Sequence, residues 1–496
     1  MGLPGNGPRE AIAMDAETIL RIKPALTRYL HEFDGCFGRR PTRAHRDTYI
    51  QGQLGPLPRK SVEPIADAAG VPPRTLQEFL GEFKWDEFAV RDLLQQRVAR
   101  RHGDPRAVGL LDETSYVKKG TKTAAVQRQH CGAVGKNENC VVSVHLGYAT
   151  PGFHTLLDGE PYLPKETWHE DRVRCRKAGI PDDVVYRPKW QIGLGQIERA
   201  LANGVRFAWI TFDEDYGGKP PFLRALDALG QTFVGELPSS FPLWTKAPEV
   251  LHRAHGRDGR AARKPRLKVK NNPACEVRDL VRSSPILRAH PWQAYRVKEG
   301  TLGPQVWEAK HLSVWLKNED GLPTRPHHLV VMRNVLEPET IKYFVSNAPE
   351  ATATETLLLV ALSRYKIEQM FEVSKGELGM DHFEVRHWRS IQRHLILSCV
   401  SHLFLAEFHE AHRGGKSGPD GAPNPHGDGA LGPRLAPGRT LLAPAGGDDP
   451  RPVAYDPTTQ RQGRPQPPQG NPAASACPRR VLEEPTHVSL AQLVAL

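Results

Sequence analysis

The sequence predicts an α/β protein. Its core is a mixed β-sheet with flanking helices, interrupted by a β-rich insertion and preceded by a helical N-terminal domain. Three observations support this fold class. Apolar residues recur at helical spacing between residues 15 and 100, short apolar runs alternate with helical segments from Val108 onward, and helical spacing returns between Thr354 and His412. Alternation of strands and helices is typical of a sheet covered by helices.

The N-terminal segment, residues 1–105, contains amphipathic runs separated by Gly and Pro, which predict helices. These runs are Glu17–Phe33, Val62–Ala69, Arg74–Phe83 and Glu87–Arg101. The middle two form a candidate helix–turn–helix over residues 62–83, in which Arg74 and Gln77 begin the second helix and would contact DNA. A plain helical hairpin within a bundle gives nearly the same pattern, so both interpretations stay open.

Residues 106–240 carry the pattern expected for the first part of the core. The strand-like runs are Val108–Leu111, Cys140–Tyr148, His154–Leu157, Phe207–Phe212 and Thr232–Leu237, and the helical runs are Gln191–Asn203 and Pro221–Gly230. Residues 241–340 are first basic and then β-rich, which predicts an insertion. Residues 341–412 return to helical spacing and would complete the core.

The C-terminal segment, residues 413–496, differs in composition from the rest. Between Ala411 and Arg480, Gly and Pro make up 26 of 70 residues. Such a segment cannot bury enough apolar surface to offset the entropy of ordering, which predicts a disordered tail. An out-of-frame C-terminus would have the same composition, and both interpretations stay open.

The charge of the chain favours a polyanionic partner. Its 67 Lys and Arg exceed its 56 Asp and Glu by 11, and residues 253–270 hold eight of the basic residues against one Asp. A solvated flexible loop is the alternative interpretation of that segment. No apolar stretch approaches the roughly 18 residues of a membrane helix, and the seven cysteines include no C-x-x-C pair. We therefore expect no membrane partner and no structural zinc.

Two predicted strands end in acids. Asp112 follows the apolar run Val108–Leu111, and Asp213 follows the run Phe207–Phe212. Ligands of α/β sheets bind at the carboxyl ends of strands, so both acids are candidates for a functional site. A solvated acid at a strand end is the alternative interpretation of Asp112.

A third acid, Glu368, lies in a predicted helix. At about 100° per residue, Arg364, Glu368 and Lys375 fall within roughly 40° of one another, so one helix edge carries a carboxylate between two cations. An ordinary salt-bridged surface helix is the alternative. Three clustered carboxylates suit a pair of Mg²⁺ or Mn²⁺ ions, because these ions prefer oxygen ligands and can assist phosphoryl transfer.

Three motifs occur in order along the chain. They are Leu111-Asp-Glu-Thr-Ser-Tyr-Val-Lys-Lys-Gly, then Asp213-Glu-Asp-Tyr-Gly, then the R-x3-E-x6-K spacing that begins at Arg364. Together they resemble the DDE transposases of bacterial insertion sequences, a group of DDE superfamily endonucleases with an RNase H-like core. The last spacing belongs to the branch with a β-rich insertion before the final acid. Ala361 departs from that branch, which often has tyrosine there.

The resemblance implies roles for the residues of these motifs. Asp112, Asp213 and Glu368 would be the catalytic, metal-binding triad. Arg364 and Lys375 would contact DNA phosphates beside the cut. The β-rich insertion would help to grip the end of the element.

Further DNA-binding candidates lie near the first acid and in the insertion. Lys119 and Arg128 follow Asp112 and would contact phosphates. Trp292 lies close to Arg296 and Lys298, and a tryptophan beside cations can stack on an unpaired base. Packing in the core is the alternative interpretation of Trp292.

The sequence therefore predicts a transposase that binds the ends of an insertion sequence and catalyses metal-dependent strand cleavage and strand transfer, in cut-and-paste DNA transposition. Its cofactor would be Mg²⁺ or Mn²⁺, and its partners would be double-stranded DNA, as terminal inverted repeats and target DNA, and a second copy in a homodimer. We expect a cytoplasmic protein that is nucleoid-associated when bound to DNA. The alternative is a catalytically inactive DNA-binding remnant or repressor of the same fold.

Overall fold

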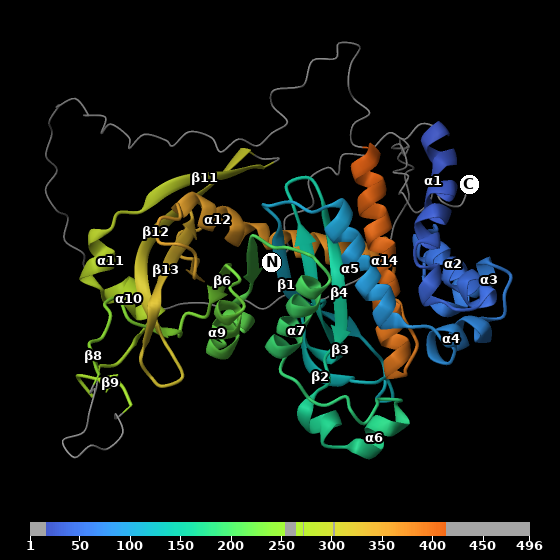
Figure 1. Ribbon diagram of the computed structural model, residues 1–496, viewed down its shortest axis with the longest axis horizontal. Coiled ribbons are helices and arrows are strands. Elements are labelled where there is room, and N and C mark those ends of the chain that lie inside the picture. The colour runs from blue at the N-terminus through green and yellow to red at the C-terminus, as the bar shows by residue number, and fades with distance from the viewer. Residues whose placement is uncertain (1–15, 253–263, 271, 301–302, 413–496) are drawn as a thin grey trace, which may run out of the picture. The chain divides into compact units, whose positions relative to one another are not determined.

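The computed structural model describes residues 16–252, 264–270, 272–300 and 303–412, and these belong to one compact unit (Figure 1). The predicted tail, residues 413–496, and residues 253–263 of the basic segment lie outside the described residues. Within the described ranges, no helix combines the length and the apolar character needed to cross a bilayer.

The chain begins with helices, as the amphipathic runs predict. They are α1 (Ala16–His31), η1 (Asp34–Cys36), α2 (Arg40–Leu54), α3 (Val62–Ala68), α4 (Pro73–Gly81) and α5 (Glu87–Arg101). The polar helix α2 was not predicted, because its sequence has only a weak apolar stripe. Helices α2, α4 and α5 contact the long C-terminal helix α14 (Trp388–His412), which Figure 1 shows in orange beside them.

A buried arginine joins α14 to the N-terminal helices. The Arg393 side chain is fully buried, pairs with Glu87 at 3.0 Å, and donates to the backbone carbonyl oxygens of Phe83 and Trp85. A buried charge is tolerated only when its hydrogen bonds are satisfied in this way. The contacts therefore fix α4 and α5 against the helix that follows the third acid.

Within the described residues, ten strands form one mixed sheet. The strands are β1 (Val108–Val117), β2 (Gln127–Cys131), β3 (Lys136–Ala149), β4 (His154–Pro161), β5 (Trp209–Phe212), β6 (Phe233–Leu237), β11 (Gln293–Gly300), β12 (Gly303–Lys317), β13 (Pro323–Asn334) and β14 (Ile341–Ser346). Their order is β11-β12-β13-β14-β6-β5-β1-β3-β2, and β4 also pairs with β3. Strands β1, β5 and β6 run parallel, and the other pairings are antiparallel.

This mixed sheet with its flanking helices is consistent with the RNase H-like core that the resemblance implies. The strands of the predicted insertion do not form a separate layer. Instead β14 pairs antiparallel with β6, so β11–β14 continue the same sheet. The described residues between β6 and β11 include several short elements. They are β7 (Pro242–Leu243), β8 (Val250–Leu251), β9 (Arg266–Leu267), β10 (Cys275–Glu276), α10 (Val277–Ser283) and α11 (Pro285–Ala289).

Helices cover both faces of the sheet. One face packs against α7 (Lys189–Ala202) and α9 (Pro220–Ala228), where Phe222 contacts Phe212 of β5 at 5.0 Å between ring centroids. The other face packs against α12 (Thr354–Ser363) and α13 (Tyr365–Gly376), where Phe371 contacts His145 of β3 at 5.3 Å. Shorter connections are η2 (Lys165–His169), α6 (Arg172–Lys177) and α8 (Glu214–Gly217). Side chains at alternate positions of a strand therefore face different helices.

Two predicted elements differ from the observed ones. The strand that begins at Val108 does not stop at Leu111 but continues to Val117, because β3 pairs with it along its whole length. The helical spacing predicted between Thr354 and His412 divides into α12, α13 and α14, with residues 377–387 outside helices.

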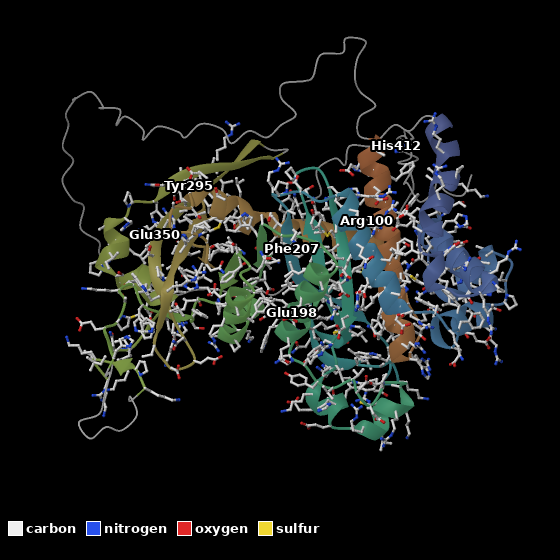
Figure 2. The ribbon with its side chains drawn as sticks, in the orientation of Figure 1. Arg100, Glu198, Phe207, Tyr295, Glu350 and His412 are labelled. Carbon is white, nitrogen blue, oxygen red and sulfur yellow. The ribbon has the colours of Figure 1, made fainter. Side chains whose placement is uncertain are left out.

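Figure 2 shows Phe207, which precedes β5 and therefore lies at the opposite end of that strand from Asp213. The centroid of its ring lies 6.0 Å from that of Tyr148.

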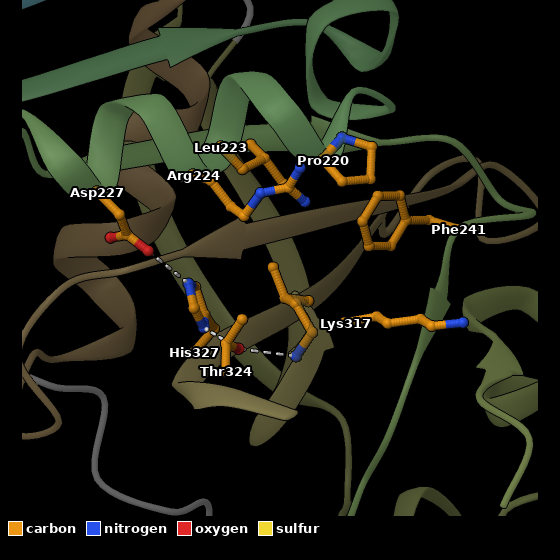
Figure 3. A pocket seen from close by; sticks show the side chains of 9 residues that line it. Pro220, Leu223, Arg224, Asp227, Phe241, Lys317, Thr324 and His327 are labelled. Carbon is orange, nitrogen blue, oxygen red and sulfur yellow. Dashed lines mark hydrogen bonds and ion pairs between the residues drawn. The ribbon is translucent and has the colours of Figure 1, made fainter. Parts of the chain in front are cut away.

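A small cavity lies between helix α9 and the inserted strands (Figure 3). Asp227, which lines the cavity, contacts His327 of β13 at 3.5 Å and forms an ion pair with Arg325 beside it at 2.8 Å. The cavity has a volume of about 10 Å³, which is room for about one water molecule. We interpret it as a packing defect between the core and the insertion, too small for a ligand.

Candidate active site

Strand β1 places Asp112 on the sheet face that α13 covers. Asp112 lies directly opposite His145 of β3, and His145 packs against Phe371 of α13. The preceding residue, Leu111, faces the other side of the sheet, where it packs against Gly193 of α7. The packing is close, because a Cβ atom added to Gly193 would lie 2.6 Å from a Leu111 methyl carbon. Asp112 is only 8% exposed. It is therefore a buried acid and not the solvated strand end of the alternative interpretation.

Strand β5 brings Asp213 beside Asp112. The parallel strands pair Leu111 with Phe212, so the two acids are the next residues in register. Adjacent strands lie about 4.8 Å apart, which makes the two backbones neighbours where the parallel pairing of β1 and β5 ends. Asp213 also caps α8, because its Oδ1 atom accepts hydrogen bonds from the backbone N–H groups of Asp215 and Tyr216.

Helix α13 carries Glu368 to the same place. The helix packs through Ile367 and Met370, which are fully buried, and the Met370 sulfur lies close above Gly147 of β3. Arg364, the residue between α12 and α13, donates from Nη1 to Oδ2 of Asp112 at 2.7 Å and pairs through Nη2 with Oε1 of Glu368 at 3.2 Å. We call these two contacts the Arg364 bridge.

The Arg364 bridge limits the distance between the first and third acids. Because the guanidinium is small and planar, the bonded oxygen atoms of Asp112 and Glu368 are at most about 8 Å apart. The structure therefore brings the three acids of the sequence motifs to one end of the sheet, from two adjacent strands and one helix.

Burial and mutual repulsion perturb the two strand acids. Burial raises the pKa of Asp112 to about 6, although the nearby Arg364 cation lowers it. Burial, followed by the charges of Asp112 and Asp215, raises the pKa of Asp213 to about 7. Although burial disfavours its charged form, the carboxylates of Asp112 and Glu368 raise the pKa of Arg364. The site holds excess negative charge that a further cation would relieve.

The donor atoms suit a divalent metal, although their present positions do not complete a site. Mg²⁺ and Mn²⁺ prefer carboxylate oxygens, which Asp112, Asp213 and Glu368 supply. Among the residues that the structure describes, no group of three Asp, Glu, His or Cys side chains lies close enough to hold a metal ion. The Arg364 guanidinium lies between Asp112 and Glu368. The residues therefore fit the metal in their chemistry, and a bound metal would require these side chains to move closer together.

The sequence analysis missed two groups near this site. Lys189 pairs with Glu113 at 2.5 Å on the face of β1 opposite to Asp112. The Tyr216 hydroxyl is buried close to the acids; burial and then the charges of Glu113 and Asp112 raise its pKa. Within the described part of the chain, neither that hydroxyl nor Oε2 of Glu113 has a hydrogen-bond partner. Lys189 lies in no pattern that distinguishes it from an ordinary surface residue, whereas Tyr216 lies in the second motif, which assigned it no role.

The basic residues expected around the triad occupy different environments. Lys119 is exposed on the segment between β1 and β2, and Arg128 is exposed on β2. Lys375 instead donates its amine to the backbone carbonyl oxygen of Ser115 at 3.3 Å and lies over the ring of Tyr116. Burial lowers the pKa of Lys375. Two cations therefore do not flank Glu368 on one exposed helix edge: Arg364 contacts it, and Lys375 points to β1.

In the insertion, the Trp292 ring contacts protein cations. The Arg333 guanidinium lies 4.2 Å and the Lys310 amine 4.9 Å from the ring centroid, and the ring is half-buried against the core. Arg296 on β11 is exposed, with polar or electrostatic contacts of its own. The side chain of Lys298 lies outside the described part of the structure.

The candidate helix–turn–helix has the expected two helices, α3 and α4. Arg74 and Gln77 are exposed on α4, and Arg74 pairs with Glu78 at 2.7 Å. Both line an open groove of about 930 Å³ whose other wall includes Arg386 and Arg389. The groove also contains several glutamates, so its charge is mixed. The role of this hairpin in DNA binding stays a prediction.

A mixed sheet that gathers acidic side chains from two adjacent strands and a helix is the arrangement of a metal-dependent nuclease or transposase. The model of the DDE superfamily endonucleases matches residues 32–304, which is more than half of the chain, and the chain therefore belongs to this family. This match includes Asp112 and Asp213 and ends before Glu368.

The chain is also similar to a probable transposase for insertion sequence element IS701 from Microchaete diplosiphon. The two are 26% identical over 344 residues, which cover 69% of this chain and 76% of that protein. The family match and this relative confirm the resemblance to DDE transposases of insertion sequences.

Proposed function

We propose that this protein is a transposase that binds the ends of an insertion sequence, cuts a DNA strand there, and joins the freed 3′ end to target DNA. The observation that carries the proposal is the convergence of Asp112, Asp213 and Glu368 at one end of the sheet. Membership of the DDE superfamily endonucleases supports the same chemistry. The comparisons do not favour the alternative of an inactive DNA-binding remnant.

In this proposal, Asp112, Asp213 and Glu368 hold two Mg²⁺ or Mn²⁺ ions. Such ions, when bound, stabilise the attacking and leaving oxygen atoms of an in-line phosphoryl transfer. The chain supplies the rigid part of the arrangement. Asp112 is fixed by the pairing of β1 with β3 and by the pairing of the preceding residues with β5, and Asp213 is fixed by the two N–H groups that it caps.

The cations of the chain would hold and orient the DNA. Lys119 and Arg128 are exposed near the carboxyl-terminal half of β1 and can pair with phosphates on the strand to be cut. Arg364 carries a planar fork of donors, which matches two oxygen atoms of a phosphate. Lys375 would act through β1, because its amine holds the Ser115 carbonyl oxygen.

We further propose that two other surfaces hold the element end. The insertion would contribute Trp292, Arg296 and Lys298, and the helical N-terminal domain would contribute Arg74 and Gln77 on α4. Because transposition joins two element ends, we propose a homodimer when the ends are paired. The proposed site of action is the cytoplasm, on the nucleoid.

The test is metal-dependent cleavage of DNA that carries the native element's terminal inverted repeats. Replacement of Glu368 by glutamine should abolish cleavage and leave end binding within a few-fold, because the amide keeps the shape but loses the negative charge. The matched control is Glu372→Gln, an exposed acid one turn further along α13. Cleavage at the wild-type rate by Glu368→Gln would refute the assignment of the triad.

A further inference from the structure

The Arg364 bridge occupies the place where Asp112 and Glu368 would meet a shared cation. The guanidinium is 2.7 Å from Oδ2 of Asp112 and 3.2 Å from Oε1 of Glu368. The side chains of Asp112 and Arg364 are 11% and 20% exposed, whereas that of Glu368 is 61% exposed. One positive charge therefore lies between two carboxylates of which only the second is open to solvent.

The three residues of the bridge differ in their freedom to move. Asp112 is held by β3, the residues just before it pair with β5, and its Oδ1 atom accepts a hydrogen bond from the N–H of Glu113 at 2.7 Å. Arg364 lies between the last residue of α12, Ser363, and the first residue of α13, at a junction of two helices. The long Arg364 side chain can therefore leave Asp112 by rotamer changes, whereas Asp112 cannot leave Arg364.

We infer that the Arg364 bridge keeps divalent cations out of the site in the DNA-free protein, and that a DNA phosphate opens the site by taking over the Arg364 guanidinium. This inference rests on the proposed function. The protein then acquires its metal ions on DNA and holds them weakly in its absence. Arg364 is therefore a positioning residue. When it pairs with the carboxylates, the site is closed to metal ions, and when it pairs with a DNA phosphate, the site is open to them.

Two physical arguments support the inference. A divalent cation beside Asp112 would lie next to a fixed positive charge in a buried site, where repulsion is poorly screened. Removal of the guanidinium without a new partner would also break the hydrogen bond to Asp112 and the ion pair with Glu368 of a half-buried arginine. A phosphate can accept from both ends of the planar guanidinium, so it can replace these two contacts.

The experiment measures Mn²⁺ binding to the DNA-free protein by the electron paramagnetic resonance signal of free Mn²⁺. We expect Arg364→Gln to bind Mn²⁺ at least tenfold more tightly than the wild type. Arg364→Lys keeps the charge but cannot bridge both acids, so it should bind with intermediate affinity. The matched control is Arg224→Gln, which removes a similarly shielded arginine paired with Glu319 at 3.1 Å and should bind as the wild type does.

A double variant, Asp112→Asn with Arg364→Gln, should lose the gained affinity; if it keeps that affinity, the gained site lies elsewhere and the inference is overturned. An Arg364→Gln variant that binds no more tightly than the wild type also overturns it. If thermal unfolding shows that Arg364→Gln is misfolded, Arg364→Lys decides, and equal affinity of that variant and the wild type counts against the inference.

The last arm adds duplex DNA with the native terminal repeats. DNA should raise the Mn²⁺ affinity of the wild type and change that of Arg364→Gln by less than a few-fold. An equal rise in both proteins would overturn the inference. Cleavage of the repeats by the wild type is scored separately. If cleavage occurs without the predicted Mn²⁺ behaviour, the inference alone fails; if the Mn²⁺ behaviour holds without cleavage, the proposed function fails.

Discussion

Replacement of Asp213 by asparagine should stabilise the metal-free protein at neutral and alkaline pH. Burial and the neighbouring charges of Asp112 and Asp215 raise the pKa of Asp213 from 3.8 to about 7. The folded protein thus binds this proton more tightly than the unfolded chain, and the wild type loses stability as the pH rises from about 4 to about 7. Asparagine does not titrate, and it caps a helix as well as aspartate does.

The size of the effect follows from the pKa difference. Each pKa unit corresponds to about 1.4 kcal/mol, so ionisation of Asp213 costs the folded state at most about 4 kcal/mol above pH 7. The free energy of unfolding of Asp213→Asn, minus that of the wild type, should therefore grow by about 2–3 kcal/mol between pH 5 and pH 8 and then level off.

The assay is urea unfolding in the presence of EDTA, followed by tryptophan fluorescence at several pH values. The control is Glu214→Gln, an exposed acid next to Asp213 in the first turn of α8. Its difference from the wild type should not change with pH in this way. A difference for Asp213→Asn that is the same at pH 5 and pH 8 would refute the reasoning that burial and repulsion hold a proton on this carboxyl group.

Two further predictions concern the same region. Burial raises the pKa values of Asp112 and Asp213 to about 6 and about 7, and both carboxyl groups must lose their protons to bind a metal. Calorimetry should therefore show a Mn²⁺ affinity that rises between pH 5.5 and pH 7.5 and is constant above pH 7.5. Replacement of Gly217 by alanine should lower the thermal midpoint, because the new Cβ would lie 1.8 Å from the carbonyl oxygen of Glu236. We expect a cost of about 1–3 kcal/mol, whereas Gly152→Ala, with no atom within 4 Å of the new Cβ, should change the midpoint little; equal effects of the two substitutions would contradict this packing argument.

The sequence predicted the strand acids because their patterns are local. An apolar run followed by an acid identifies a buried strand with a polar end, and parallel neighbours place such ends at one edge of a sheet. The register of β1 and β5 sets Asp112 beside Asp213, although β1 continues past Asp112 to Val117. Helical spacing likewise predicted the pair of Arg364 and Glu368, which are one turn apart and in contact at 3.2 Å.

The contacts that close the site could not be predicted, because they depend on tertiary packing. The helical spacing placed Lys375 beside Glu368, but the end of α13 directs its amine to the Ser115 carbonyl oxygen. The second contact of Arg364, to Asp112, joins residues 252 positions apart. The cations against Trp292 come from β12 and β13, which the sequence showed only as β-rich.

Anomalous diffraction from crystals of the protein with Mn²⁺ and duplex DNA of the element's ends tests the triad most directly. We expect two Mn²⁺ peaks about 3.5–4 Å apart, bound by carboxylate oxygens of Asp112, Asp213 and Glu368, with the Arg364 guanidinium moved to a phosphate. Mn²⁺ peaks away from these three residues, or Arg364 still bridging Asp112 and Glu368 beside a cleaved DNA end, would contradict the assignment.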